Sequence, residues 1–192
     1  MSFATQYRPN KLDDVLGNKP VKKVITDMVK STFSHILLEG YRGCGKTTLA
    51  YVIADLFGAD RQNITKINCV YMSGVDEMRN RLDGLNKSSI FGRKKVIILD
   101  EIHGLSKQAQ QVFLTPLEEL NKDSLVIACT TTTEAVNPML LDRFKRLRVQ
   151  PLNDDDAITL IKRVCKVEKI ADHEERWKQR PKKERAILPA HD

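Results

Sequence analysis

Apolar residues recur at two different spacings along the chain, and the spacing predicts alternating helices and strands. Over residues 21–29 they recur every three or four positions, which predicts an amphipathic helix. The short apolar run at 35–39 ends at a glycine and predicts a buried strand. Helical spacing returns over 46–57, and Gly58 follows as a helix stop.

The same alternation continues through residue 129. The pattern predicts strands over 64–70, 95–100 and 124–129, and helices over 75–85 and 107–120. The run at 95–100 is β-branched and ends in an acid, which is typical of a central strand in a parallel sheet. Pro116 should kink the last helix or shorten its first half. Strands alternating with helices predict an α/β domain with a parallel sheet.

The character of the sequence changes after Pro151. Asn153 followed by three aspartates predicts a helix start, because a capping side chain precedes acids in the positive first turn. Beyond Ile170 the chain is highly charged without periodicity, so this tail is expected to be flexible. We therefore expect a core over 1–150, a helical segment over 151–170 and a tail over 171–192.

Composition narrows the class of protein. The 192 residues carry a net charge of +7, with 41% hydrophobic and 30% charged residues, which indicates a soluble globular chain and excludes global disorder. No apolar run approaches the ~20 residues of a membrane helix, and the N-terminus has no secretory h-region. We expect a cytoplasmic protein. The basic balance permits a nucleic-acid partner without demanding one.

The cysteines give no sign of a metal centre. Cys44, Cys69, Cys129 and Cys165 lie far apart, with no C-x-x-C pair. We expect four reduced thiols that pack as small hydrophobic side chains.

Residues 40–47 carry the first chemical motif. Their sequence, Gly-Tyr-Arg-Gly-Cys-Gly-Lys-Thr, matches G-x-x-x-x-G-K-[ST] and lies between a predicted strand and a predicted helix. Its glycines let backbone N–H groups turn toward a polyphosphate, and the helix adds its positive end. Lys46 would supply charge to the β- and γ-phosphates, and Thr47 a hydroxyl ligand for Mg²⁺. A glycine-rich turn with an incidental lysine is the alternative.

Two acids follow the apolar strand at 95–100. Asp100 and Glu101 would emerge at the carboxyl edge of a parallel sheet, where ligands bind in α/β folds. Asp100 can support Mg²⁺, and Glu101 can polarise a water for attack on the γ-phosphate. Taken alone, this Asp-Glu motif would be explained by solvation of a strand end. Together with the glycine-rich loop it predicts ATP and Mg²⁺ as cofactors.

These motifs resemble those of AAA+ ATPases of the clamp-loader clade, similar to the bacterial DNA polymerase III gamma/tau subunit and to replication factor C small subunits. The resemblance covers about 7–170. It implies an AAA+ P-loop NTPase core with a central parallel sheet flanked by helices. The nucleotide-binding positions that it implies are Tyr7, Arg8, Pro9, Leu16, Gly17, Gly40, Arg42, Gly43, Cys44, Gly45, Lys46, Thr47 and Thr48.

The resemblance also assigns two residues further along. Thr131 falls where the family has a polar sensor of the γ-phosphate, and Arg143 falls on the arginine inserted into a neighbouring subunit's site. The family usually has Ser-Arg-Cys around that arginine, whereas this chain has Asp-Arg-Phe. The alternatives are a β-branched strand end for Thr131 and a solvated basic stretch for Arg143.

A clamp loader would have other AAA+ subunits, a sliding clamp and primer–template DNA as partners, and no membrane. Candidate phosphate contacts to DNA are Arg79, Arg81, Lys87 and Lys107. Ile90 and Phe91 form an apolar pair that resembles the clamp-contacting wedge of loader subunits, although Phe91 could equally pack beneath the next strand.

The resemblance has limits that bear on activity. Only the first helix of the family's lid is matched, without the second sensor arginine, the collar or the cysteine-rich zinc insertion of cellular gamma/tau proteins. A compact phage- or plasmid-like loader would fit, with hydrolysis dependent on partner subunits. A Holliday-junction branch-migration motor is the rival, although that motor inserts a β-hairpin where residues 119–126 leave space for a turn. A non-hydrolysing nucleotide-binding scaffold is the third possibility.

Overall fold

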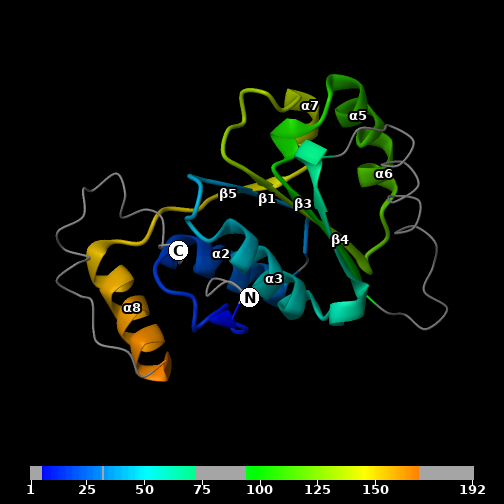
Figure 1. Cartoon of the computed structure of the whole chain (residues 1–192). Coiled ribbons are helices and arrows are strands. Elements are labelled where there is room, and N and C mark those ends of the chain that lie inside the picture. Colours follow the sequence, from blue (N-terminus) through cyan, green and yellow to red (C-terminus); the bar gives the residue numbers. More distant parts are fainter. Residues whose placement is uncertain (1–5, 32, 72–93, 169–192) are drawn as a thin grey trace.

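A central parallel sheet organises the chain in its computed structural model, which describes residues 6–31, 33–71 and 94–168. Five strands form it: β1 (Ile36–Glu39), β2 (Ile64–Asn68), β3 (Lys95–Asp100), β4 (Ser124–Thr130) and β5 (Lys145–Arg148). Their order is β2-β3-β4-β1-β5, and every neighbouring pair is parallel (Figure 1). The predicted α/β fold class is confirmed.

The register aligns the last residues of the strands at one edge. Asn68 lies opposite Asp100, and Glu39 lies between Thr130 and Arg148. Because all strands run the same way, this carboxyl edge gathers the loops that follow each of them. Polar and charged residues from all five strands therefore end at this edge.

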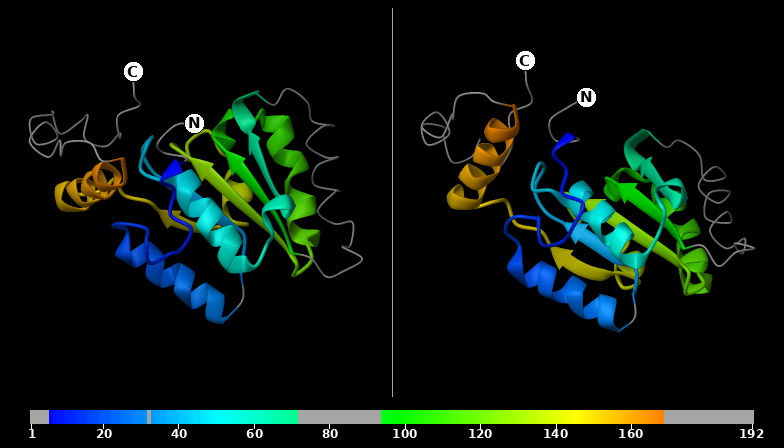
Figure 2. Two further views of the ribbon diagram at one scale, coloured as in Figure 1. Left: turned by 60° about the horizontal axis from the view of Figure 1, so that its bottom comes forward. Right: turned by 90° about the horizontal axis from the view of Figure 1, so that it is seen from below.

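Helices cover both faces of the sheet. One face packs against α2 (Lys19–Lys30) and α3 (Lys46–Phe57), and the other against α5 (Lys107–Val112), α6 (Leu114–Glu119) and α7 (Pro138–Leu141) (Figure 2). In β3, Val96 and Ile98 point to the first face while Ile97 and Leu99 point to the second. Burial on both faces explains the continuous apolar run that predicted this strand.

Two predicted elements differ from the structure. The strand expected over 64–70 ends at Asn68, and residues 69–71 form a short 3₁₀ helix. The cause is local: the Asn68 side chain accepts a hydrogen bond from the Val70 N–H at 3.1 Å, which turns the chain out of the sheet. The helix expected over 75–85 lies outside the described residues.

The helix expected over 107–120 is broken in two at Phe113, as the kink predicted from Pro116 requires. Pro116 has no N–H with which to bond the carbonyl four residues earlier, so the helical ladder is interrupted there. α5 begins at a capped end, where the Ser106 hydroxyl accepts a hydrogen bond from the Ala109 N–H at 3.2 Å.

The last described helix, α8 (Asp154–Glu168), stands beside the sheet rather than over it (Figure 1). Its predicted cap is confirmed, because the Asn153 side chain accepts from the Asp156 N–H at 2.8 Å. Contacts with the N-terminal segment hold the helix, including Arg163 donating to the Asp14 carbonyl at 3.3 Å. None of the helices in the described ranges has the length and apolar character to cross a membrane.

The four cysteines are free and buried, as predicted from their spacing. Burial raises the pKa of the Cys69 thiol to about 12, so this thiol stays protonated at neutral pH. Within residues 6–31, 33–71 and 94–168, no group of three or more His, Cys, Asp or Glu side chains could hold a metal ion.

A buried glutamine ties α5 to the segment before α7. Gln110, 1% exposed, donates to the carbonyls of Leu105 and Ala135 at 3.0 Å each and accepts from the Asn137 N–H at 2.6 Å. We expect Gln110→Ala to lower the free energy of unfolding by about 3 kcal/mol, because it leaves three backbone groups without partners. Urea unfolding measures this. The exposed neighbour Gln111→Ala should change it by less than about 0.5 kcal/mol, and equal effects would contradict the assignment.

Candidate functional site

The loop over residues 40–45 joins β1 to α3 and depends on glycine at three positions. Gly43 and Gly45 have φ values of 79° and 93°, in the left-handed region that favours glycine. A Cβ on Gly40 would lie 2.3 Å from the Val149 carbonyl oxygen, so a side chain there would push the loop away from the strand end. The motif predicted from sequence therefore folds between a strand and a helix N-terminus.

Lys46 reaches back across this loop. Its side-chain ammonium donates to the carbonyls of Gly40 at 2.8 Å and Tyr41 at 3.0 Å, and the residue is 6% exposed. The charge is thereby held at the mouth of the loop, beside the N-terminal turn of α3. An anion seated in the loop would meet this cation together with the helix N-terminus.

Thr47 and Asp100 come together from α3 and β3. The Thr47 hydroxyl lies 3.4 Å from Asp100 Oδ2. Hydroxyl and carboxylate oxygens are the ligands that Mg²⁺ prefers, and two of them bound side by side at 2.0–2.1 Å would lie about 3 Å apart. The donor set and its spacing therefore fit a magnesium ion.

Glu101 follows Asp100 in a strained backbone conformation, with φ at 56°. Its Oε2 is buried without a hydrogen-bond partner and lies 3.3 Å from His103 Nδ1. The same His103 nitrogen lies 3.0 Å from the Thr130 hydroxyl, which in turn donates to the Thr132 carbonyl at 2.5 Å. Because that hydroxyl hydrogen is already used, His103 Nδ1 carries the proton and donates to Thr130. His103 thus joins the acid to the end of β4.

The charges around this edge oppose one another. Burial raises the pKa of the thiol of Cys129, the residue before the last one of β4. Asp100 and Glu101 raise that pKa further, while Lys46 and Lys66 lower it. Two cations and two carboxylates therefore lie close enough to act on one buried thiol, and Lys66 belongs to this group although the sequence pattern did not single it out.

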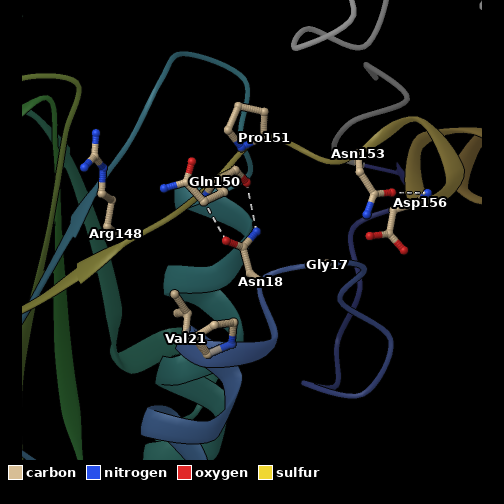
Figure 3. A pocket seen from close by; sticks show the side chains of 9 residues that line it. Gly17, Asn18, Val21, Arg148, Gln150, Pro151, Asn153 and Asp156 are labelled. Atoms are coloured by element: carbon tan, nitrogen blue, oxygen red, sulfur yellow. Dashed lines mark hydrogen bonds between the residues drawn. The ribbon is translucent and has the colours of Figure 1, made fainter.

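A cavity of about 420 Å³ lies between the start of α2 and the segment that leads from β5 to α8. It is lined by Gly17, Asn18, Pro20, Val21, Arg148, Gln150, Pro151, Asn153 and Asp156. Figure 3 shows the Asn18 amide turned toward Gln150: it donates to the Gln150 carbonyl at 3.0 Å and accepts from the Gln150 N–H at 2.7 Å. This pair ties the start of α2 to the segment leading from β5 to α8. The volume suits a small organic ligand.

The N-terminal residues that were expected to contact the nucleotide do not all lie at the cavity. Gly17 lines the cavity, with φ at 67°, and Leu16 precedes it. Tyr7 instead hydrogen-bonds Glu168 of α8, a contact that raises the pKa of the Tyr7 hydroxyl. The Arg8 guanidinium lies 4.7 Å from the centre of the Tyr51 ring on α3, and the half-buried Pro9 follows it.

The two residues assigned by resemblance to sensing and to trans action lie at different edges. Thr131 directly follows β4 at the carboxyl edge and is exposed. Arg143 lies two residues before β5, at the amino edge, and forms an ion pair with Glu118 of α6. The strands between these edges span about 13 Å, at about 3.3 Å per residue.

The remaining predicted positions fall into two groups. Within the loop, Arg42 and Gly43 are exposed, Cys44 is buried, and Thr48 on α3 is half-buried. Lys107, the one candidate DNA contact that the structure describes, is exposed at the start of α5. The others, Arg79, Arg81 and Lys87, together with the proposed clamp wedge Ile90 and Phe91, lie outside the described residues.

Sequence reasoning missed Lys66, His103 and Asn18 as members of the site. Lys66 comes from β2, 34 positions before its partner, and only the parallel pairing of β2 with β3 brings them together. Asn18 carried one available signal, since a small polar residue before a helix is a candidate cap. Its φ of 50° instead directs its side chain toward Gln150.

Comparison with known proteins identifies a family over most of the chain. The family described as "ATPase family associated with various cellular activities (AAA)" matches residues 36–152. The replication factor C small subunit of Haloarcula marismortui is 31% identical over 170 residues, covering 86% of this chain and 52% of that protein. The ATPase WRNIP1 of Dictyostelium discoideum is 33% identical over 174 residues, covering 86% of this chain and 19% of that protein.

A solved structure shares the fold. The Thermotoga maritima RuvB Holliday junction branch migration motor superposes with a TM-score of 0.71 at 24% identity, covering 84% of this chain and 55% of that chain. Several other replication factor C small subunits match at 28–30% identity. This chain spans about half the length of the curated replication factor C relatives that it matches.

Proposed function

The chain belongs to the AAA family of ATPases, and on that premise we propose that it is the ATP-binding and ATP-hydrolysing subunit of a DNA sliding-clamp loader. One observation carries the proposal: proteins named as replication factor C small subunits match 81–88% of the chain. The geometry of the carboxyl edge supports the ATP-binding part of the proposal, because a glycine-rich loop, a lysine, a hydroxyl and two carboxylates lie together there.

The residues of the edge would divide the chemistry of ATP hydrolysis. Backbone amides of 40–45 and the ammonium of Lys46 would hold the β- and γ-phosphates. Thr47 and Asp100 would hold Mg²⁺, which when bound neutralises charge on the phosphate oxygens. Glu101 would accept the proton of the attacking water. Thr131, at the end of β4, would contact the γ-phosphate.

The cavity lined by Gly17 and Asn18 would receive the adenine. It lies between the N-terminal segment at Gly17 and the segment leading to α8, and two of its lining residues flank Val149, whose carbonyl approaches Gly40. A base seated there would place its phosphates toward the loop. The Asn18–Gln150 hydrogen bonds would keep the two walls of the cavity at a fixed separation. Tyr7, Arg8 and Pro9 would brace the wall from outside.

Arg143 would act on a neighbouring subunit. The strands separate it from the phosphate loop of its own chain, so the guanidinium cannot reach its own nucleotide. In an oligomer, that amino edge could face the carboxyl edge of the next subunit, and the guanidinium would then stabilise charge on the transferring phosphoryl group. Its ion pair with Glu118, half exposed, would open on assembly.

We propose that the chain is organised as a nucleotide-binding core over 1–150, a partial helical lid over 151–170 and a charged tail over 171–192. Partners would be other AAA+ subunits, a sliding clamp and primer–template DNA. Lys107, exposed on α5, is the described candidate for a phosphate contact.

The branch-migration motor is less well supported than the loader. Its solved structure is similar at 24% identity, which speaks for a common fold. The connection between α6 and β4 spans residues 120–123, which leaves no space for the β-hairpin that such motors insert. The scaffold alternative differs from the loader only in that it does not hydrolyse ATP. Measuring the ATPase rate with different DNA substrates therefore distinguishes the loader, the motor and the scaffold.

We expect the ATPase rate of the full chain with its partner subunits to rise at least tenfold when primer–template DNA and the sliding clamp of the same organism are added. Binding of the DNA and the clamp would order the AAA+ subunits, so that each brings an arginine to a neighbouring subunit's nucleotide. Phosphate release measures the rate. Stimulation by four-way junctions alone would indicate the motor, and intact ATP binding without turnover would indicate the scaffold; both outcomes contradict the loader.

A further inference from the structure

Lys66 holds the carboxylate that the site would offer to a metal. Its Nζ lies 2.6 Å from Asp100 Oδ2, the same oxygen that lies 3.4 Å from the Thr47 hydroxyl. The lysine comes from β2, where its partner across the ladder is Ile98, and its side chain extends past that residue to the carboxyl edge. Asp100 is therefore already paired with a cation of this chain.

This pairing opposes the binding of a second cation at the same carboxylate oxygen. A metal bound to Oδ2 at 2.0–2.1 Å would lie within about 4.7 Å of the ammonium, and two positive charges at that separation repel each other. Lys66 is also free to withdraw, because 38% of its side chain is exposed and water can replace the carboxylate. Asp100, at the end of β3, is 15% exposed and so less accessible to water than the lysine.

We propose that Lys66 is the resident counter-ion of Asp100 and competes with Mg²⁺ for it, so that it sets how strongly nucleotide binding depends on the metal. This inference rests on the proposed nucleotide site. Without metal, Lys66 neutralises Asp100 and lets phosphates approach the edge. With metal, Lys66 must give up its ion pair, and the lost pairing weakens binding of the metal–nucleotide complex.

The experiment measures the affinity of a fluorescent ADP analogue, with Mg²⁺ and with EDTA, for wild type and Lys66→Gln. With Mg²⁺ we expect the variant to bind about fivefold more tightly, because no ion pair has to be broken. With EDTA we expect it to bind more weakly, because Asp100 then faces the phosphates without a counter-ion. Opposite changes in the two conditions distinguish competition from an ordinary phosphate contact.

Two control variants make the result specific. Lys122→Gln removes the same charge at an exposed position before β4, at the far edge of the sheet, and should leave both affinities within about twofold. Lys66→Arg retains the cation and should keep the wild-type dependence on Mg²⁺. Circular dichroism would verify that each variant is folded.

The possible failures are separable. Weaker binding of Lys66→Gln in both conditions would assign Lys66 to the phosphates, and unchanged binding with Mg²⁺ would remove any competition; either result overturns the inference and leaves the nucleotide site standing. Absence of binding by the wild-type chain in both conditions would overturn the proposed function, and this inference with it.

Discussion

Lys46→Ala is expected to abolish measurable ATP binding, with an affinity at least about 100-fold lower than that of wild type. The variant loses the ammonium that bonds the loop carbonyls, and with it charge-assisted hydrogen bonds to phosphate that each contribute about 1.5–3 kcal/mol. A loss of about 3 kcal/mol corresponds to roughly a 100-fold change in affinity. Isothermal titration calorimetry with ATP measures it directly.

A control is needed because Lys46 also braces the loop through the carbonyls of Gly40 and Tyr41. Lys30→Ala, at an exposed position in the last turn of α2, removes the same side chain away from the site and should bind ATP as wild type does. The unfolding midpoints of both variants show whether the loop change has spread. An affinity for Lys46→Ala within threefold of wild type would refute the phosphate role of Lys46.

The elements predicted correctly are those in which local pattern and tertiary environment agree. The bounds of α3 match the prediction, because its apolar spacing and the glycine at each end specify a helix without help from the rest of the fold. β3 is central in the sheet and buried on both faces, so its apolar run reflects its surroundings directly. In both segments the sequence alone carried enough information.

Where the prediction failed, a side-chain contact decided the outcome. The Asn68 side chain ended β2 two residues early, although the apolar pattern continued to Val70. A hydrophobic pattern does not reveal hydrogen bonds between a side chain and the nearby backbone. It records a residue only as polar, whether or not that residue turns the chain. Element ends are therefore harder to predict than element types.

The residues of the candidate site also differ in how far their positions depend on long-range contacts. Residues of one continuous motif, such as Lys46 and Thr47, could be proposed from spacing alone, since the loop and helix that position them are local. Lys66 and His103 entered only through strand pairing and through the end of β4, both of which are long-range. A charge that completes a site from another strand has no sequence pattern of its own.

Glu101→Gln is expected to slow ATP hydrolysis by about 100- to 1,000-fold while leaving ATP affinity within about twofold. The amide has the same shape as the carboxylate but cannot accept the proton of the attacking water, and loss of a general base costs about 10²–10⁴ in rate. Phosphate release at saturating ATP, with partner subunits, primed DNA and clamp present, measures the rate, and calorimetry measures the affinity. Wild-type hydrolysis by the variant would show that the water is activated elsewhere.

A matched control is available on α6, and the surroundings of Glu101 explain why an isosteric substitution is needed. Glu119→Gln makes the same substitution at an exposed position on α6 and should hydrolyse ATP at the wild-type rate. Glu101 itself has a left-handed backbone and a buried Oε2 beside His103, so a smaller residue would disturb the end of β4 as well as the chemistry. Glutamine keeps the side-chain volume, and unchanged affinity together with an unchanged unfolding midpoint would assign the lost rate to the missing proton acceptor.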